Sequence, residues 1–210
     1  MIALVDYGAG NLTSVRKALA AIDAAVFTPD RPGALEAARA VIVPGVGHFA
    51  ATRPLDEGWR AAMHAGLAAG RPLLGICVGL QWFFDGSAEE PGLPGLGLFP
   101  GVCTRLGTGT PPALKVPHVG WNSLTLPRAS RLFDGVANDA QVYFTHSYAA
   151  PVVTDTVAIC EYGVPFSAAV ERGLVSAVQF HPEKSGDVGL RVLKNWVQGL
   201  TDQRTTAGAR

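Results

Sequence analysis

The chain has 210 residues, of which 48% are hydrophobic and 16% charged, with 17 basic residues against 17 acidic ones. This length suits one well-buried α/β domain and is short for two. The balanced charge provides no basic surface for nucleic acid or an anionic membrane, so we expect neither as a partner. The odd number of cysteines, the lack of a signal-peptide pattern and the absence of a membrane-length apolar run predict a cytoplasmic protein.

The first half of the chain alternates predicted strands and helices. Apolar runs predict strands at residues 2–6, 25–28, 40–44 and 73–77, and helical spacing predicts helices at residues 12–22 and 55–69. This alternation is typical of a parallel sheet with helices on both faces. Gly8 and Gly10 follow the first strand, but Thr13 replaces the third glycine of a dinucleotide-binding fingerprint, so we reject a nucleotide site there.

The second half of the chain is richer in short β runs. Residues 87–97 are predicted as a loop, and β runs follow at residues 102–106, 123–126, 141–144, 156–160, 166–170 and 174–180. These runs predict a partly antiparallel extension of the sheet. Apolar spacing over residues 188–200 predicts a closing amphipathic helix. We expect one domain over residues 1–200 and a frayed tail over residues 201–210.

The stretch from Leu73 to Gln81 has the features of a nucleophile elbow. An apolar run ends at Cys77, with Gly75 and Gly79 two residues away on either side, and the residues that follow carry no turn signal. A strand that turns directly into a helix at a nucleophile is the geometry of G-x-S-x-G hydrolases, here with sulfur in place of oxygen. The N-terminus of the helix favours the thiolate, which is the form that attacks.

His181 and Glu183 are the predicted partners of this cysteine. A cysteine nucleophile needs a base, and the base needs a group that orients it. His181 ends a predicted strand and precedes Pro182, which favours extended backbone, so the His181 and Glu183 side chains project to the same side. Because the carboxyl ends of parallel strands share one edge of a sheet, we expect His181 to meet Cys77 there.

Each of these features also has a simpler interpretation. Cys77 alone is equally well explained as a small buried core residue, and Glu183 as a surface carboxylate beside a partly buried histidine. Metal binding is a further alternative, but one His-x-Glu pair with a distant cysteine lacks the spacing of zinc ligands. We therefore predict neither a metal nor a cofactor. Cys103 and Cys160 are interpreted as small apolar residues.

Two signatures together resemble those of class I, or triad, glutamine amidotransferases, and the joint match is far more specific than either half. They are Gly75-Ile76-Cys77-Val78-Gly79-Leu80-Gln81 and Phe180-His181-Pro182-Glu183-Lys184-Ser185. Four more stretches resemble the glutaminase subunits of imidazole glycerol phosphate synthases. These are Asp6-Tyr7-Gly8-Ala9-Gly10-Asn11-Leu12, Pro44-Gly45-Val46-Gly47, Lys115-Val116-Pro117-His118-Val119-Gly120-Trp121-Asn122 and Tyr143-Phe144-Thr145-His146-Ser147-Tyr148. The departures, Val78, Leu80, Val119 and Thr145, are modest changes of side chain.

The resemblance implies a flavodoxin-like fold and a role for each matching residue. Cys77 would attack the side-chain amide of glutamine, with His181 as acid and base and Glu183 orienting it. The oxyanion donors would be the N–H of Val78 and a group in the loop of Val46 and Gly47, which turns inward when a partner is engaged. Three residues would hold the backbone of glutamine: Gln81, Ser147 and Tyr148.

The resemblance also implies a partner that uses the ammonia. This would be a (β/α)8-barrel cyclase subunit, docked over the site as a heterodimer, which makes imidazole glycerol phosphate and an aminoimidazole carboxamide ribotide. Asn11, Trp121 and Lys184 are predicted at that interface, although core packing and solvent exposure are simpler explanations for the last two. Two other functions stay open: another amidotransferase of the same class, or a noncatalytic module in which Cys77 senses redox state.

Overall fold

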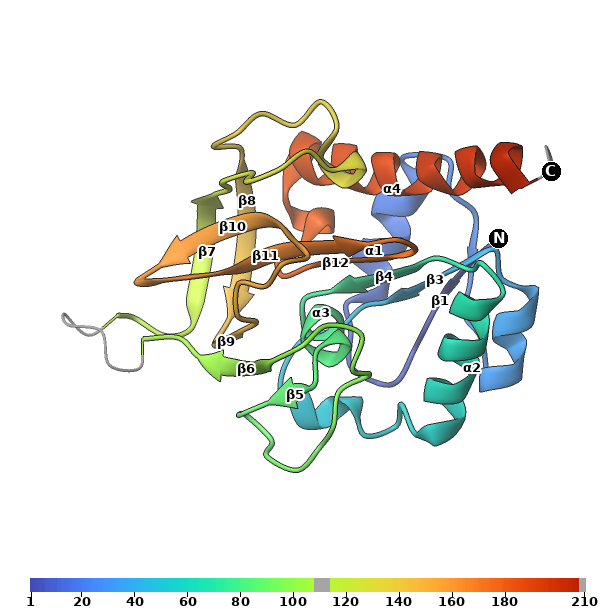
Figure 1. Cartoon of the computed structure of the whole chain (residues 1–210), viewed down its shortest axis with the longest axis horizontal. Helices are drawn as coiled ribbons and strands as arrows, with labels where there is room; N and C mark the ends of the chain where they lie inside the picture. Colours follow the sequence, from blue (N-terminus) through green and yellow to red (C-terminus); the bar gives the residue numbers. More distant parts are fainter. Residues whose placement is uncertain (108–113, 208–210) are drawn as a thin grey trace.

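The computed structural model describes residues 1–107 and 114–207, with side chains described through residue 200. A seven-stranded sheet occupies the centre, in the order β10-β11-β12-β4-β3-β1-β2 (Figure 1). Its strands are β1 (Ile2–Leu4), β2 (Val26–Phe27), β3 (Ala40–Val43), β4 (Leu73–Ile76), β10 (Thr156–Tyr162), β11 (Val164–Arg172) and β12 (Val175–Val178). The neighbouring strands β2, β1, β3, β4 and β12 run parallel, whereas β11 and β10 extend the sheet with antiparallel pairing. The predicted fold class is confirmed.

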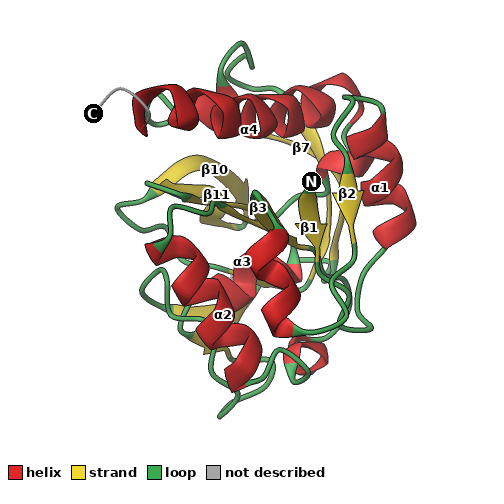
Figure 2. Cartoon of the chain, turned by 90° about the vertical axis from the view of Figure 1, so that its right-hand side faces the viewer, coloured by secondary structure: helices red, strands yellow, loops and turns green. Residues whose placement is uncertain are grey.

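Helices cover both faces of this sheet (Figure 2). On one face lie α1 (Leu12–Ala20) and α4 (Gly186–Ala207), and on the other lie α2 (Glu57–Ala68) and the short α3 (Val78–Phe83). Successive residues of a strand point to opposite faces. Thus Ile2 packs into the core that contains Val15 of α1, while its neighbour Ala3 packs into the core that contains Met63 of α2. The two apolar cores explain why the short parallel strands read as continuous apolar runs.

Smaller β elements and turns complete the described chain. A hairpin joins β7 (His118–Ser123) to β8 (Gln141–His146), and β6 (Val102–Arg105) pairs with both β5 (Gly86–Ser87) and β9 (Tyr148–Ala149). Short 3-10 helices are η1 (Pro32–Ala37), η2 (Phe49–Thr52), η3 (Arg131–Phe133) and η4 (Pro182–Lys184).

Two sequence predictions need correction or completion here. The strand predicted at residues 123–126 is wrong in position, because the ladder runs from His118 to Ser123 and pairs with β8. Its apolar residues Val119 and Trp121 face solvent, and Gly120 has a φ of 136°, so the usual pattern of a half-buried strand is missing. The backbone of residues 201–207 continues α4. Residues 208–210 lie outside the described residues, so the frayed tail stays a prediction.

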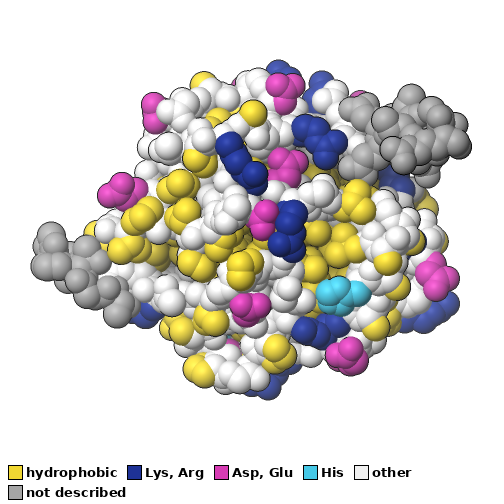
Figure 3. Space-filling model, in the orientation of Figure 1, with side chains coloured by type: hydrophobic (Ala, Val, Ile, Leu, Met, Phe, Trp, Pro, Cys, Tyr) yellow, Lys and Arg dark blue, Asp and Glu magenta, His cyan; other side chains and the backbone are white. Residues whose placement is uncertain are grey.

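The exposed surface is mixed in character. On the face drawn in Figure 3, basic and acidic side chains are interspersed, without a continuous field of one sign. Among the described helices, none has both the length and the apolar character needed to cross a membrane.

Candidate active site

Cys77 occupies a sharp turn between β4 and α3. Its φ is +55° and its ψ is −107°, a conformation that residues other than glycine rarely adopt. The glycines on either side permit the turn. A Cβ at Gly79 would lie 1.9 Å from the carbonyl oxygen of Val43, and a Cβ at Gly75 would lie 2.8 Å from the backbone of Gly79. The segment therefore has the geometry of a nucleophile elbow.

His181 lies beside this elbow because two parallel strands end together. In the register of β4 and β12, Ile76 pairs with Val178, and the N–H of Cys77 donates to the Val178 carbonyl at 2.8 Å. His181 follows three residues after β12 ends. The structure thus places Cys77 and His181 next to each other where these strands end.

Glu183 reaches His181 in a way that differs from the prediction. The Nδ1 atom of His181 lies 2.8 Å from Oε1 of Glu183, and only 1% of either side chain is exposed. The backbone does not stay extended, however, because η4 begins at Pro182, and the carboxylate returns to the ring over a 3-10 turn. A proline fits the first position of such a turn, because the N–H that it lacks would have no partner there.

Charge within the site favours the imidazolium form of His181. Burial alone lowers the pKa of His181, but the Cys77 sulfur and the Glu183 carboxylate oppose it and raise this pKa to about 10. The His181 Nε2 atom is buried and makes no hydrogen bond within the described residues. The sulfur of Cys77 and the ring of His181 are therefore close neighbours, and their interaction favours a thiolate beside an imidazolium.

The predicted oxyanion loop lies against the first turn of α3. Residues 45–47 follow β3, which is the neighbour of β4 in the sheet. A Cβ at Gly45 would lie 2.7 Å from Cβ of Val78 and 2.3 Å from the buried hydroxyl of Tyr7, so only glycine fits. Gly47 has a φ of +90°, which glycine adopts at no steric cost. Val46 is half-buried between them.

The three predicted glutamine-binding residues line one cavity of about 250 Å³. Gln81, Ser147 and Tyr148 border it, together with Gly47 of the oxyanion loop. Cys77 does not line this cavity, and only 2% of the surface of Cys77 is exposed. In this structure the sulfur is covered, so an amide group needs a local displacement to reach it.

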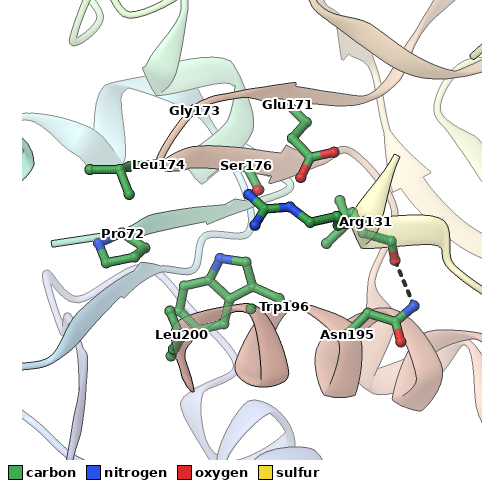
Figure 4. A pocket seen from close by; sticks show the side chains of 11 residues that line it. Pro72, Arg131, Glu171, Gly173, Leu174, Ser176, Asn195, Trp196 and Leu200 are labelled. Atoms are coloured by element: carbon green, nitrogen blue, oxygen red, sulfur yellow. Dashed lines mark hydrogen bonds between the residues drawn. The ribbon is translucent and has the colours of Figure 1, made fainter. Parts of the chain in front are cut away.

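Another cavity lies at the opposite ends of the central strands from Cys77 (Figure 4). Pro72 and Leu174, which directly precede β4 and β12, line it together with Trp196 of α4. Its volume is about 20 Å³, which is room for about one water molecule. It is too small for a substrate and is remote from the cysteine.

Gln179 is a residue of the site that sequence reasoning missed. Its Nε2 donates to Sγ of Cys77 at 3.6 Å, and Gln179 is fully buried. Strand periodicity could have found it, because alternate residues share a side and Gln179 is two positions before His181.

The predicted interface residues lie on the outside. Trp121 is 56% exposed, and its ring packs edge-on against Tyr143 with centroids 6.1 Å apart. The Nζ atom of Lys184 lies 5.8 Å from the centre of the same Tyr143 ring. Asn11 has a local structural role, because its side chain caps α1 by accepting from the N–H of Ser14 at 3.2 Å. Trp121 and Lys184 thus contact the same ring, and α1, which Asn11 caps, packs against η4, the turn that contains Lys184.

Comparisons with known proteins agree with this geometry. The profile of the family described as Glutamine amidotransferase class-I matches residues 3–199. The chain belongs to this family. It is 46% identical to the imidazole glycerol phosphate synthase subunit HisH of Methanothermobacter thermautotrophicus, over 94% of this chain and 98% of the relative. It is also 46% identical to the HisH subunit of Deinococcus radiodurans, over 95% of this chain and 94% of that protein.

Solved structures support the class I amidotransferase fold. A crystal structure of a glutamine amidotransferase superposes with a TM-score of 0.73 at 18% identity, covering 96% of this chain and all of the other. The structure of PurLQS from Thermotoga maritima gives a TM-score of 0.69 at 19% identity, covering 95% of this chain and 98% of that one. Within the described residues, no group of three or more His, Cys, Asp or Glu side chains could hold a metal ion.

Proposed function

We propose that this chain is the glutaminase subunit of an imidazole glycerol phosphate synthase. It hydrolyses L-glutamine to glutamate and ammonia and supplies the ammonia to a cyclase subunit in histidine biosynthesis. The observation that carries the proposal is the buried arrangement of Cys77, His181 and Glu183 at one edge of the sheet. The full-length similarity to HisH subunits favours this member of the family over other amidotransferases of the class.

The reaction begins with the Cys77 thiolate, which forms a bond to the side-chain amide carbon of glutamine. The electron pair of the carbonyl moves to oxygen and gives a tetrahedral oxyanion. His181 is held as an imidazolium by Glu183 and by the sulfur itself, so it carries the proton that the leaving nitrogen needs. When the carbon–nitrogen bond breaks, ammonia departs and a thioester remains on Cys77.

Hydrolysis of the thioester uses the same residues, with His181 now acting as the base. The neutral His181 now accepts a proton from water, whose oxygen attacks the thioester carbon. The carbon–sulfur bond breaks, glutamate leaves, and the thiolate–imidazolium pair is restored. Glu183 stabilises His181 in its charged form through the bond at 2.8 Å, and it fixes which ring nitrogen faces the sulfur.

Donors for the oxyanion come from both sides of the sulfur. Val78 is the first residue of α3, and the N–H groups of a first helical turn have no partner within the helix. The loop of Val46 and Gly47 is the second source, and the positive φ of Gly47 leaves its peptide groups free to reorient. We propose that docking of the partner completes this second donor.

Gln81 can contribute to glutamine binding only through its oxygen. Both hydrogens of its amide are directed at groups of the chain itself, the Tyr148 carbonyl at 2.8 Å and the Gln179 side-chain oxygen at 3.2 Å. Its Oε1 is left to accept from the ammonium group of glutamine. Ser147 and Tyr148 border the same cavity and would hold the remainder of the substrate.

The partner is proposed to be a (β/α)8-barrel cyclase subunit that forms a heterodimer with residues 1–200 of this chain as one domain. It would use ammonia to make imidazole glycerol phosphate and an aminoimidazole carboxamide ribotide. The exposed Trp121 and Lys184 support a docking surface on the outer side of the β7–β8 hairpin. Asn11 belongs to this proposal through the family resemblance, and α1, which it caps, contacts the turn that contains Lys184.

The first prediction tests the proposal through glutamate release. We expect slow glutamine hydrolysis by the isolated chain and strong stimulation when the cyclase subunit and its ribotide substrate are added. Cys77→Ala should abolish the stimulated activity, because it removes the sulfur on which the proposed thioester forms. Cys160→Ala is the matched control, since its thiol is also buried but lies on β10, which β11 and β12 separate from β4.

Two results would contradict the proposal. One is stimulated hydrolysis that survives Cys77→Ala, which would exclude the thioester route. The other is wild-type activity that does not respond to the cyclase subunit while a different amidotransferase partner stimulates it.

A further inference from the structure

A short chain of buried hydrogen bonds links a backbone carbonyl to the catalytic sulfur. The Gln81 side-chain nitrogen donates to the Tyr148 carbonyl at 2.8 Å and to the Gln179 side-chain oxygen at 3.2 Å. The Gln179 side-chain nitrogen then donates to Sγ of Cys77 at 3.6 Å. Gln81 is 3% exposed and Gln179 is 0% exposed, so both amides are buried.

The direction of every bond in this chain follows from its first member. A backbone carbonyl can only accept, so Gln81 must present its NH2 group to Tyr148. The same NH2 group faces Gln179, which must therefore turn its oxygen toward Gln81. This leaves the NH2 group of Gln179 facing the sulfur. Rotation of either amide would place two acceptors or two donors against each other in a buried site.

A second arm fixes the Tyr148 carbonyl from the other side. The His146 Nδ1 atom lies 2.9 Å from that carbonyl and must carry a hydrogen, so its Nε2 accepts from Nδ1 of His118 at 3.2 Å. The Nε2 atom of His118 in turn lies 3.3 Å from the side-chain nitrogen of Asn122. All these bonds are consistent with neutral imidazoles at His118 and His146. The Tyr148 carbonyl therefore accepts from His146 on one side and from Gln81 on the other.

We propose that Gln179 is a catalytic hydrogen-bond donor to the Cys77 sulfur and that Gln81 is a positioning residue that keeps this donor directed at it. The inference rests on the proposed role of Cys77 as the nucleophile. A thiolate accepts hydrogen bonds and donates none, and a bond to a charged acceptor is stronger than one to the neutral thiol. The Gln179 amide therefore favours the thiolate, in addition to the imidazolium of His181.

The test measures the thiolate directly, by the rate at which iodoacetamide alkylates Cys77 between pH 5 and pH 10. Gln179→Met removes the donor without adding charge, and Gln179→Glu places an acceptor at the sulfur. We expect the alkylation rate to fall about tenfold in both variants on the acid side of the wild-type profile, because less of the thiol is present as thiolate. Glutamine hydrolysis by the complex should fall with it.

Gln81→Glu provides an independent variant that does not touch the sulfur. The new carboxylate has no hydrogens for Gln179, so the Gln179 amide should rotate and turn its oxygen to Cys77. We expect the alkylation profile of Gln81→Glu to resemble that of Gln179→Glu, and the double variant to add little further. Gln141→Glu is the matched control, because Gln141 is exposed at the start of β8. Cys77→Ala gives the background from the other two thiols.

Each outcome decides the proposal. An unchanged profile in Gln179→Met would overturn the donor role, whether or not Gln179→Glu shifts the profile. A wild-type profile in Gln81→Glu would overturn the positioning role. Because alkylation needs neither glutamine nor a partner, a failure here is distinct from a failure of the proposed function, which the hydrolysis assay detects separately.

Discussion

Cys77 holds a strained backbone conformation that its neighbours enforce. A φ of +55° is unfavourable for a side chain with a Cβ, and such outliers persist only where the surrounding structure determines them. Here the surroundings are β4 on one side and the close approach of Gly79 to the Val43 carbonyl on the other. The strain presents the sulfur at the tip of a turn, between the N–H of Val78 and the ring of His181.

The second prediction concerns this close approach. Gly79→Ala would place a Cβ 1.9 Å from the Val43 carbonyl oxygen, which belongs to the backbone of a central strand. Because that backbone cannot move without disturbing β3, we expect a loss of about 3 kcal/mol or more in the free energy of unfolding. Urea denaturation followed by circular dichroism measures it.

Gly199→Ala is the matched control for this substitution. Gly199 lies within α4, and a Cβ there would meet nothing within 4 Å. An alanine in a helix interior is more favourable than glycine, so we expect a gain of about 0.5–1 kcal/mol. A Gly79→Ala variant as stable as the wild type would show that the elbow does not require glycine.

At the scale of elements, the β7–β8 hairpin buries two histidines beneath an exposed apolar face. His118 is stacked between Phe144 and Tyr162, with ring centroids at 4.8 Å and 4.1 Å. Burial lowers the pKa of His118 to about 4 and that of His146 to about 3. The hairpin therefore holds both imidazoles neutral where the unfolded chain would bind protons.

The third prediction is a pH dependence of stability with two limbs. Below pH 6.5 both His118 and His146 bind a proton in the unfolded chain but stay neutral in the folded chain. The free energy of unfolding should therefore fall as the pH drops from about 6.5 toward 4. Above pH 6.5 the folded chain retains the proton of His181, whose pKa is raised to about 10, so stability should decline again as the pH rises toward 10. Denaturant titrations at a series of pH values test both limbs.

A pair of variants assigns the acid limb to the hairpin. His146→Gln keeps a donor near the Tyr148 carbonyl but cannot titrate, so the acid limb should become shallower while the alkaline limb is retained. His64→Gln, at an exposed position of α2, should leave the whole profile unchanged. An acid limb of wild-type slope in His146→Gln would contradict this explanation.

At the scale of the whole molecule, the site lies where the parallel strands end and beside the outer hairpin. The sheet brings Cys77 after β4 and His181 after β12 to one edge, and η4 carries Lys184 from that edge to the surface. Lys184 and Trp121 both contact the ring of Tyr143. A partner that covers this surface would therefore contact the segment that contains Glu183.

The fourth prediction is that this surface supplies binding energy without supporting the fold. Trp121→Ala and Lys184→Ala should each weaken binding of the cyclase subunit by at least about fivefold, because aromatic and cationic anchors dominate such interfaces. Stability and Cys77 alkylation should stay as in the wild type, since Trp121 is 56% exposed. Titration calorimetry or fluorescence anisotropy measures the dissociation constant.

Lys194→Ala is the control for Lys184→Ala, because it removes the same charge from an exposed position on α4. It should leave binding unchanged. Equal losses in the two lysine variants would indicate a general effect of charge, and unchanged binding in Trp121→Ala would exclude the hairpin as the docking surface.

The amino-acid sequence by itself determined the layered α/β fold, the elbow at Cys77 and the pairing of His181 with Glu183. These are local patterns: apolar runs, helical spacing, glycines around a cysteine and a two-residue separation after a strand. Each of these patterns involves residues that are close in the chain, so it can be recognised without knowing how distant segments pack.

Only the tertiary structure decided the contacts that join distant segments. The β7 strand escaped prediction because its stability comes from pairing with β8 and from a buried histidine, not from an apolar alternation. Gln179 and Gln81 are 98 positions apart, and no local pattern says that their amides meet beside the sulfur. Long-range polar contacts in a buried site are set by packing, and a sequence pattern carries no information about their direction.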